Sequence, residues 1–197
     1  IKQFIKSTQM GAYGASLLKG KDDKIAADKA AVDMMRYELN KIEMKGQIVI
    51  GEGELDEAPM LYIGEKVGTQ KGEEFDIAVD PLEGTNFTAK NLPNALSVMA
   101  ITKKNNLFKA PETYMEKIAI GKGLPGNLVD LDFSIKKNIN RLAEAKNVNI
   151  DKINVCLLDR PRHKKIIDEL KKLKVNIKLI SDGDVAGVLN VTDETKN

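Results

Sequence analysis

Apolar residues recur along the chain with two spacings, one typical of helices and one typical of strands. A spacing of three to four residues predicts helices over about residues 4–18, 24–42, 60–67, 133–145 and 161–173. Short apolar or alternating runs predict strands at residues 48–50, 75–79, 95–102, 117–120, 153–158 and 175–180. Helices and strands in this mixture predict an α/β fold of mixed layers.

The last two predicted strands, residues 153–158 and 175–180, are joined by a single predicted helix. Strands joined in this way are parallel, and the connection is almost always right-handed. Both strands therefore end at one edge of their sheet, which is where open α/β sheets bind ligands. With a hinge expected at residues 147–151, we predict an αβ domain over residues 1–147 and a partial α/β domain with this βαβ unit over residues 148–197.

Residues 75–85, with the sequence FDIAVDPLEGT, lead from a predicted buried strand into an unusual turn. The strand is expected to stop at Asp80 and its following proline, and to turn through a glycine into Thr85. The turn holds two carboxylates, Asp80 and Glu83. Because proline fixes its own φ and glycine adopts angles that other residues avoid, both carboxylates and the Leu82 carbonyl can face one point. Such oxygen ligands suit Mg²⁺ or Mn²⁺, and a hydroxyl beside the ion can position a water molecule.

A second acidic residue, Asp28, heads a helix stripe that is otherwise apolar and consists of Val32, Met35 and Leu39. Burying a lone carboxylate is expensive unless a cation or several donors compensate its charge. The other interpretation is that Asp28 sits in the first turn of its helix, where the helix dipole favours a negative charge. The sequence leaves both interpretations open.

A third acidic feature follows the predicted strand 48–50, where four acidic residues fall within residues 52–57, beginning with Glu52. Glycines flank these residues, which favours a loop. Like charges this close repel one another, so the loop is either well solvated or wrapped around a metal ion.

The composition excludes several classes of protein. A hydrophobic content of 42% and a charged content of 30% are ordinary for a soluble globular protein, and a net charge of +2 gives no reason to invoke nucleic acid. No run approaches the roughly 18 apolar residues that span a bilayer. The single Cys156 can form no internal disulfide, so we expect a cytoplasmic setting. Ile1 is not an initiator methionine, and we expect the native polypeptide to begin earlier or to have been trimmed.

Three segments together carry a resemblance to a known family. Residues 80–85, DPLEGT, resemble the signature of the metal-dependent, lithium-sensitive sugar and inositol phosphatases. Taken with residues 51–60, GEGELDEAPM, and residues 159–163, DRPRH, they resemble in collinear order the bacterial-type class II fructose-1,6-bisphosphatases. The resemblance covers nearly the whole chain but only the first part of the family's usual length.

The resemblance implies a set of functional residues at matching positions. It implies two or more divalent ions, Mn²⁺ or Mg²⁺, and the implied metal ligands are Asp28, Glu52, Asp80, the Leu82 carbonyl and Glu83. Thr85 would align the attacking water and Glu52 would receive its proton. The implied substrate-binding residues are Lys24, Glu83, Gly84, Thr85, Tyr114, Arg160, Pro161, Arg162, Asp182, Gly183 and Asp184. Without the resemblance, interloop salt bridges for the charged residues and a packing role for Tyr114 stay open, and His163 is expected to be structural or a phosphate neighbour.

The function that the resemblance implies is hydrolysis of the 1-phosphate of fructose 1,6-bisphosphate to fructose 6-phosphate in gluconeogenesis, with sedoheptulose 1,7-bisphosphate as a second substrate. A homo-oligomer, dimer or tetramer, is expected, with no nucleic-acid or membrane partner. The alternatives are a related phosphomonoesterase such as an inositol monophosphatase, or an impaired, truncated homologue that serves as a binding subunit.

The chain departs from the family at its end. It stops before the glycine-rich Pro-Glu-Gly segment whose glutamate contributes to a metal site in that family. We therefore expect a fragment or a polypeptide that continues, with a naturally shortened relative as the third explanation.

Overall fold

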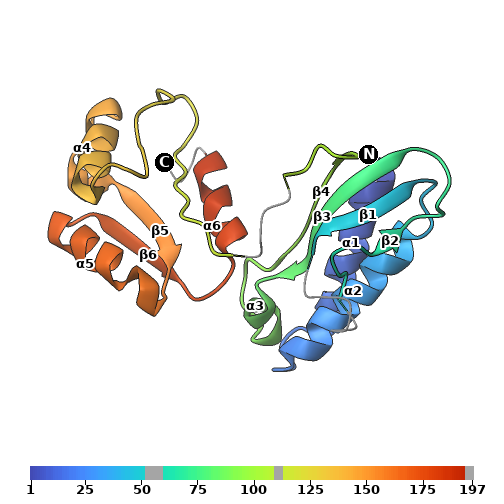
Figure 1. Cartoon of the computed structure of the whole chain (residues 1–197). Coiled ribbons are helices and arrows are strands. Elements are labelled where there is room, and N and C mark those ends of the chain that lie inside the picture. Colours follow the sequence, from blue (N-terminus) through green and yellow to red (C-terminus); the bar gives the residue numbers. More distant parts are fainter. Residues whose placement is uncertain (52–59, 109–112, 194–197) are drawn as a thin grey trace. The chain divides into compact units, whose positions relative to one another are not determined.

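The computed structural model describes residues 1–51, 60–108 and 113–193, and the chain divides into two compact units, Ile1–Glu112 and Thr113–Asn197. Each unit combines helices with strands, which confirms the expected α/β class (Figure 1). None of the described helices is long and apolar enough to cross a membrane.

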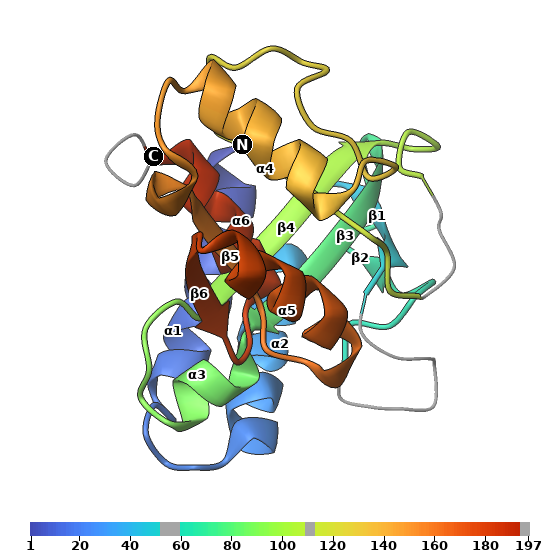
Figure 2. The same cartoon turned by 90° about the vertical axis from the view of Figure 1, so that its left-hand side faces the viewer.

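The first unit is a four-stranded mixed sheet with helices packed against it. Its elements are α1 (Lys2–Ser16), α2 (Lys24–Leu39), β1 (Lys45–Ile50), β2 (Lys66–Val67), β3 (Glu74–Glu83), α3 (Thr85–Ala89) and β4 (Leu96–Lys103). The strand order is β2-β1-β3-β4, with β1 parallel to β3 and the other two pairs antiparallel. Helices α1 and α2 lie side by side against the sheet (Figures 1 and 2).

The core of this unit confirms the apolar stripe expected on α2. Val32, Met35 and Leu39 are fully buried and pack against Ile48 of β1 and Ile77 of β3. The helix begins where the sequence predicts, because the Asp23 carboxylate caps it by accepting a hydrogen bond of 2.9 Å from the backbone N–H of Ala26.

Helices α1 and α2 approach each other closely at Gly14. A Cβ atom at this position would lie 2.5 Å from the Ala30 carbonyl oxygen, so no larger residue fits without a shift of the helices. Gly14 therefore allows the short distance between α1 and α2.

Two expectations for the first unit are wrong. Strand β3 does not stop at Asp80 and its proline but runs to Glu83, because a bulge absorbs the proline inside the strand. The described residues of 60–67 form no helix. Gly64 has a φ of +96°, which breaks a right-handed helix, and its N–H donates to the Ile48 carbonyl of β1 instead.

The second unit is built around a parallel βαβ unit, as predicted. Its elements are α4 (Ile135–Ala145), the 3₁₀ turn η1 (Ile150–Lys152), β5 (Asn154–Leu158), η2 (Pro161–His163), α5 (Lys164–Leu173), β6 (Asn176–Ile180), α6 (Asp184–Leu189) and η3 (Asn190–Thr192). Strands β5 and β6 pair in parallel register from Asn154 with Asn176 to Leu158 with Ile180.

The division between the units falls earlier than the sequence suggests, at residue 112 and not at residue 147. The reason is helix α4, whose Ile139 and Ala143 pack into one core with Ile153, Leu170 and Val175. A helix that shares its core with β5 and α5 belongs to their unit.

The strand predicted at residues 117–120 is also wrong. These residues are described, and they form neither helix nor strand. Ile118 is exposed. A run of strand-forming residues becomes a strand only when a neighbouring edge accepts its hydrogen bonds, and local pattern cannot report whether one does.

Candidate active site

The bulge in β3 brings the two carboxylates of the DPLEGT turn to one side of the sheet. Asp80 pairs with Val98 and Glu83 pairs with Leu96, so three steps along β3 match two steps along β4. Val98 and Leu96 are two residues apart in a strand and share a face, and paired residues project to the same side. The extra residue therefore makes Asp80 and Glu83 neighbours on one side, where regular alternation would put them on opposite sides.

Leu82, at the bulge, joins this turn to the helix that carries Asp28. Its side chain is buried against Ala27 and Ala31 of α2, which lie one residue before and three residues after Asp28. Two backbone hydrogen bonds of 2.9 Å hold the segment before α2 onto α3, from Gly20 N–H to the Thr88 carbonyl and from Asp22 N–H to the Ala89 carbonyl. Packing and hydrogen bonds thus attach the start of α2 to the elements on both sides of Gly84.

Asp28 carries a buried carboxylate oxygen on helix α2. Its Oδ1 atom is buried and has no hydrogen-bond partner among the described residues. Burial raises the pKa of Asp28 above its ordinary value, because desolvation disfavours the charged carboxylate. If Asp28 served only to interact with the helix dipole, its carboxylate oxygens would be exposed to water or would accept hydrogen bonds from backbone N–H groups.

The other expected metal ligands are placed in part. Glu83 is only 6% exposed, and Oδ1 of Asp80 and Oε2 of Glu83 are buried. Glu52 lies outside the described residues. Among residues 1–51, 60–108 and 113–193, no group of three or more His, Cys, Asp and Glu side chains that could hold a metal ion is found. The ligand set therefore stays a prediction, and buried carboxylate oxygens are the donor type that Mg²⁺ and Mn²⁺ require.

Gly84 and Thr85 lie where β3 gives way to α3. Gly84 has a φ of +80°, and a Cβ atom there would lie 2.9 Å from the Phe87 ring, so this position requires glycine. Thr85 is the first residue of α3 and is half-buried. Lys24, another expected substrate residue, is exposed at the first position of α2.

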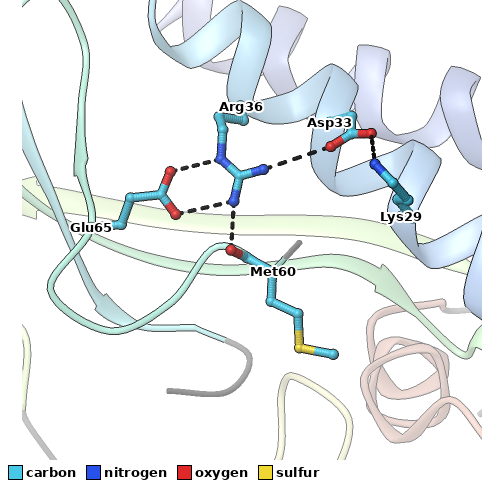
Figure 3. A network of polar contacts seen from close by, with 5 residues as sticks. All are labelled: Lys29, Asp33, Arg36, Met60 and Glu65. Carbon is cyan, nitrogen blue, oxygen red and sulfur yellow. Dashed lines mark hydrogen bonds and ion pairs between the residues drawn. The ribbon is translucent and has the colours of Figure 1, made fainter. Parts of the chain in front are cut away.

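Arg36 of α2 holds the segment that follows the acidic residues 52–57 (Figure 3). Its guanidinium forms two parallel hydrogen bonds with the Glu65 carboxylate, at 2.7 and 3.1 Å, and donates a third to the Met60 carbonyl. Asp33, one turn earlier on the helix, lies 3.7 Å from the same guanidinium and accepts from Lys29 at 2.6 Å. No local sequence pattern indicates the contact between Arg36 and Glu65, because the two residues are 29 positions apart in the chain.

Gly51 provides a second connection beside this network. A Cβ atom at Gly51 would collide with the Leu61 carbonyl, so the chain on one side of residues 52–59 touches the chain on the other side. Only glycine allows two backbones to approach this closely.

In the second unit, three expected substrate residues take part in two side-chain contacts. The Arg162 guanidinium carbon lies 4.2 Å from the centre of the Tyr114 ring, a cation–π contact, and Tyr114 is 84% exposed. Lys117 Nζ lies 2.9 Å from Asp184 Oδ2. A packing role for Tyr114 does not agree with its exposure. Sequence reasoning missed Lys117, because the residue stands in a stretch interpreted as a strand.

The remaining expected residues border the same two loops. Pro161 begins η2, and Arg160 donates to the Asp159 carbonyl at 3.2 Å. Asp182 Oδ1 accepts from the backbone N–H of Gly183 at 3.1 Å, and Gly183 has a φ of +75° before α6. Nδ1 of His163 lies 2.8 Å from the Leu158 carbonyl oxygen, a contact that agrees with the structural interpretation.

Comparisons with known proteins give one consistent answer. A family model described as bacterial fructose-1,6-bisphosphatase, glpX-encoded, matches residues 1–197. The chain is 46% identical over 185 residues to the class 2 fructose-1,6-bisphosphatase of Haemophilus influenzae, covering 94% of this chain and 55% of that protein.

Two further relatives agree. Fructose-1,6-bisphosphatase 1 class 2 of Escherichia coli is 46% identical over 93% of this chain and 54% of its own length. D-fructose 1,6-bisphosphatase class 2/sedoheptulose 1,7-bisphosphatase of Synechococcus elongatus is 42% identical over 95% of this chain and 58% of its own length. The chain spans about half the length of these curated relatives.

Proposed function

This chain belongs to the family of bacterial fructose-1,6-bisphosphatases, and from that premise we propose that the protein hydrolyses the 1-phosphate of fructose 1,6-bisphosphate. The structural observation that supports the proposal is the Oδ1 atom of Asp28, which is buried and has no hydrogen-bond partner among the described residues. Its helix is attached to the turn that holds Asp80 and Glu83. A carboxylate oxygen buried in this way suits a protein that binds cations.

We propose that Asp28, Glu52, Asp80, Glu83 and the Leu82 carbonyl hold two or more Mn²⁺ or Mg²⁺ ions. Bound divalent ions would neutralise charge on the transferring phosphoryl group and on the leaving oxygen. The buried carboxylates supply hard oxygen donors, and the bulge directs two of them to the same side. Three of these residues, Asp28, Asp80 and Glu83, each have a buried carboxylate oxygen.

The reaction then divides among the chain's own residues. The Thr85 hydroxyl orients the attacking water, and Glu52 accepts its proton as the water oxygen bonds to phosphorus. The bond between phosphorus and O1 of the sugar breaks in the same step, and the leaving oxygen takes up a proton from solvent. Lys24, Gly84 and Glu83 border the phosphate that is released.

In the second unit, Arg160 and Arg162 with Pro161 bind the phosphate that stays on the sugar, because guanidinium groups match phosphate oxygens. Tyr114 supports Arg162 through its ring face. Asp182, Gly183 and Asp184 accept hydrogen bonds from the sugar hydroxyls. These roles make the second unit the part that binds the sugar and its retained phosphate, and the first unit the part that binds the metal ions.

We further place the reaction in gluconeogenesis and in the cytoplasm, where sugar phosphates are made and consumed. Sedoheptulose 1,7-bisphosphate is proposed as a second substrate, which the name of the Synechococcus relative supports. A dimer or tetramer is proposed as well. The proposal is supported by three exposed apolar residues, Ile5 and Tyr13 on α1 and Leu17 just after it. Light scattering would measure the size of the oligomer.

The test is phosphate release from fructose 1,6-bisphosphate with Mn²⁺, for the chain as given and for its Asp80→Ala and Thr85→Ala variants. We expect activity in the parent and a loss of at least a hundredfold in each variant. A panel of fructose 1-phosphate, fructose 1,6-bisphosphate and inositol 1-phosphate then defines the substrate. Full activity in both variants, or a preference for inositol 1-phosphate, would refute the proposal.

A further inference from the structure

The segment formed by residues 113–119 is exposed and has neither helix nor strand, yet two of its side chains make specific contacts. The Tyr114 ring lies against Arg162, and the Lys117 ammonium lies against Asp184. Arg162 follows β5, and Asp184 opens α6 after β6. Because β5 and β6 are parallel, both loops lie at the edge of the sheet where ligands bind.

The two residues that make these contacts are close together in the segment. Three residues of extended chain span roughly 10 Å, and Tyr114 and Lys117 are three residues apart. The segment therefore reaches from the loop after β5 to the loop after β6, with one side chain on each. Three of the four residues involved are expected to bind substrate, and Lys117 is the one that no motif assigns.

The Lys117 contact does little for stability. The side chains of Lys117 and Asp184 are 63% and 46% exposed, and ion pairs in such surroundings contribute little to folding. What the contact does is restrict the rotation of a carboxylate. Lysine donates and never accepts, so the contact restrains one Asp184 oxygen beside the ammonium group. A hydroxyl that binds to an oriented acceptor avoids the cost of ordering it.

We infer that Lys117 is a positioning residue that holds the Asp184 carboxylate in the orientation that binds the sugar hydroxyls of the substrate. The inference rests on the proposed function. It differs from direct phosphate binding by Lys117, in which the ammonium would act on the substrate independently of Asp184.

A double-mutant cycle tests the inference. KM and kcat for fructose 1,6-bisphosphate with Mn²⁺ are measured for K117A, D184N and the double variant, and fructose 6-phosphate binding is measured by calorimetry. We expect K117A to raise KM and the fructose 6-phosphate Kd about three- to fivefold with little change in kcat. K117R should recover most of the affinity, and K117A should have no further effect in the D184N background.

The matched control is Lys164→Ala, which removes a similar exposed lysine that lies 3.6 Å from Asp168 on α5. It should change neither KM nor Kd. An unchanged KM in K117A, or effects of K117A and D184N that multiply, would overturn the inference. Absence of hydrolysis with intact fructose 6-phosphate binding would reject the proposed function, while the calorimetric cycle would still decide the role of Lys117. Absence of both activities would reject both.

Discussion

Replacing Asp28 by asparagine should make the metal-free protein more stable and abolish its stabilisation by Mn²⁺. The carboxylate sits at the head of an apolar stripe with a buried Oδ1 that no described residue satisfies. Asparagine has the same shape without the charge. The substitution removes a charge whose buried oxygen is unsatisfied, which should raise the stability of the metal-free protein. It also removes a proposed metal ligand.

The two effects have different sizes. An unsatisfied buried polar group costs about 1–3 kcal/mol, and asparagine keeps part of that cost, so we expect a gain of about 1 kcal/mol. For a unit of this size this corresponds to an increase of roughly 4 °C in Tm. Saturating Mn²⁺ at a hundred times Kd should stabilise the parent by about 2.7 kcal/mol, and this increment should disappear in the variant.

The assay is thermal unfolding with and without MnCl₂. The matched control is Asp33→Asn on the same helix, which alters an exposed carboxylate paired with Lys29 and Arg36. It should destabilise the protein by roughly 0.5 kcal/mol and keep the full response to Mn²⁺. If Asp28→Asn lowers the metal-free Tm and keeps the Mn²⁺ response, Asp28 serves the helix and not a cation.

Three more substitutions probe the surroundings of the site. Arg36→Ala removes both hydrogen bonds to the buried Glu65 carboxylate and should lower the free energy of unfolding in urea by about 2–3 kcal/mol. Arg36→Lys should recover part of this loss, and an unchanged urea midpoint in Arg36→Ala would contradict the prediction. Gly51→Ala should cost about 1–3 kcal/mol, because its methyl group meets a backbone carbonyl; a neutral result would refute the contact. Hydrogen bonding from Lys41 lowers the pKa of Glu38, so its contribution is present above the ordinary pKa and lost as pH falls through the lowered value. The stability difference between the parent and Glu38→Gln should therefore shrink between about pH 5 and pH 3, and a difference independent of pH would exclude the ion pair.

The sequence predicted what local pattern encodes. The stripe on α2 and the βαβ unit follow from period and from the handedness of crossovers, and the structure confirms both. Membership of the family, read from the DPLEGT turn and two further segments, is confirmed by the comparisons.

What the sequence could not predict depends on partners distant in the chain. The bulge in β3 exists only in relation to β4, since an extra residue is defined by the strand that it is paired with. The contact of Lys117 with Asp184 joins residues that are 67 positions apart in the chain, so no local pattern could predict it. Helix α4 is a further case. The spacing of Ile135, Ile139 and Leu142 predicts an apolar face, but only the structure shows that this helix packs into the core of the second unit.

The tight fit of Gly14 against Ala30 gives a chemically inert position an influence on where Asp28 lies. Ala30 lies two residues from Asp28, so a methyl group at position 14 would push the beginning of α2 outwards and carry the carboxylate with it. Ions of different radius need different distances to their oxygens. For the proposed metal site, exchange of one small residue at this helix crossing would change the preference between manganese and magnesium while every proposed ligand stays the same.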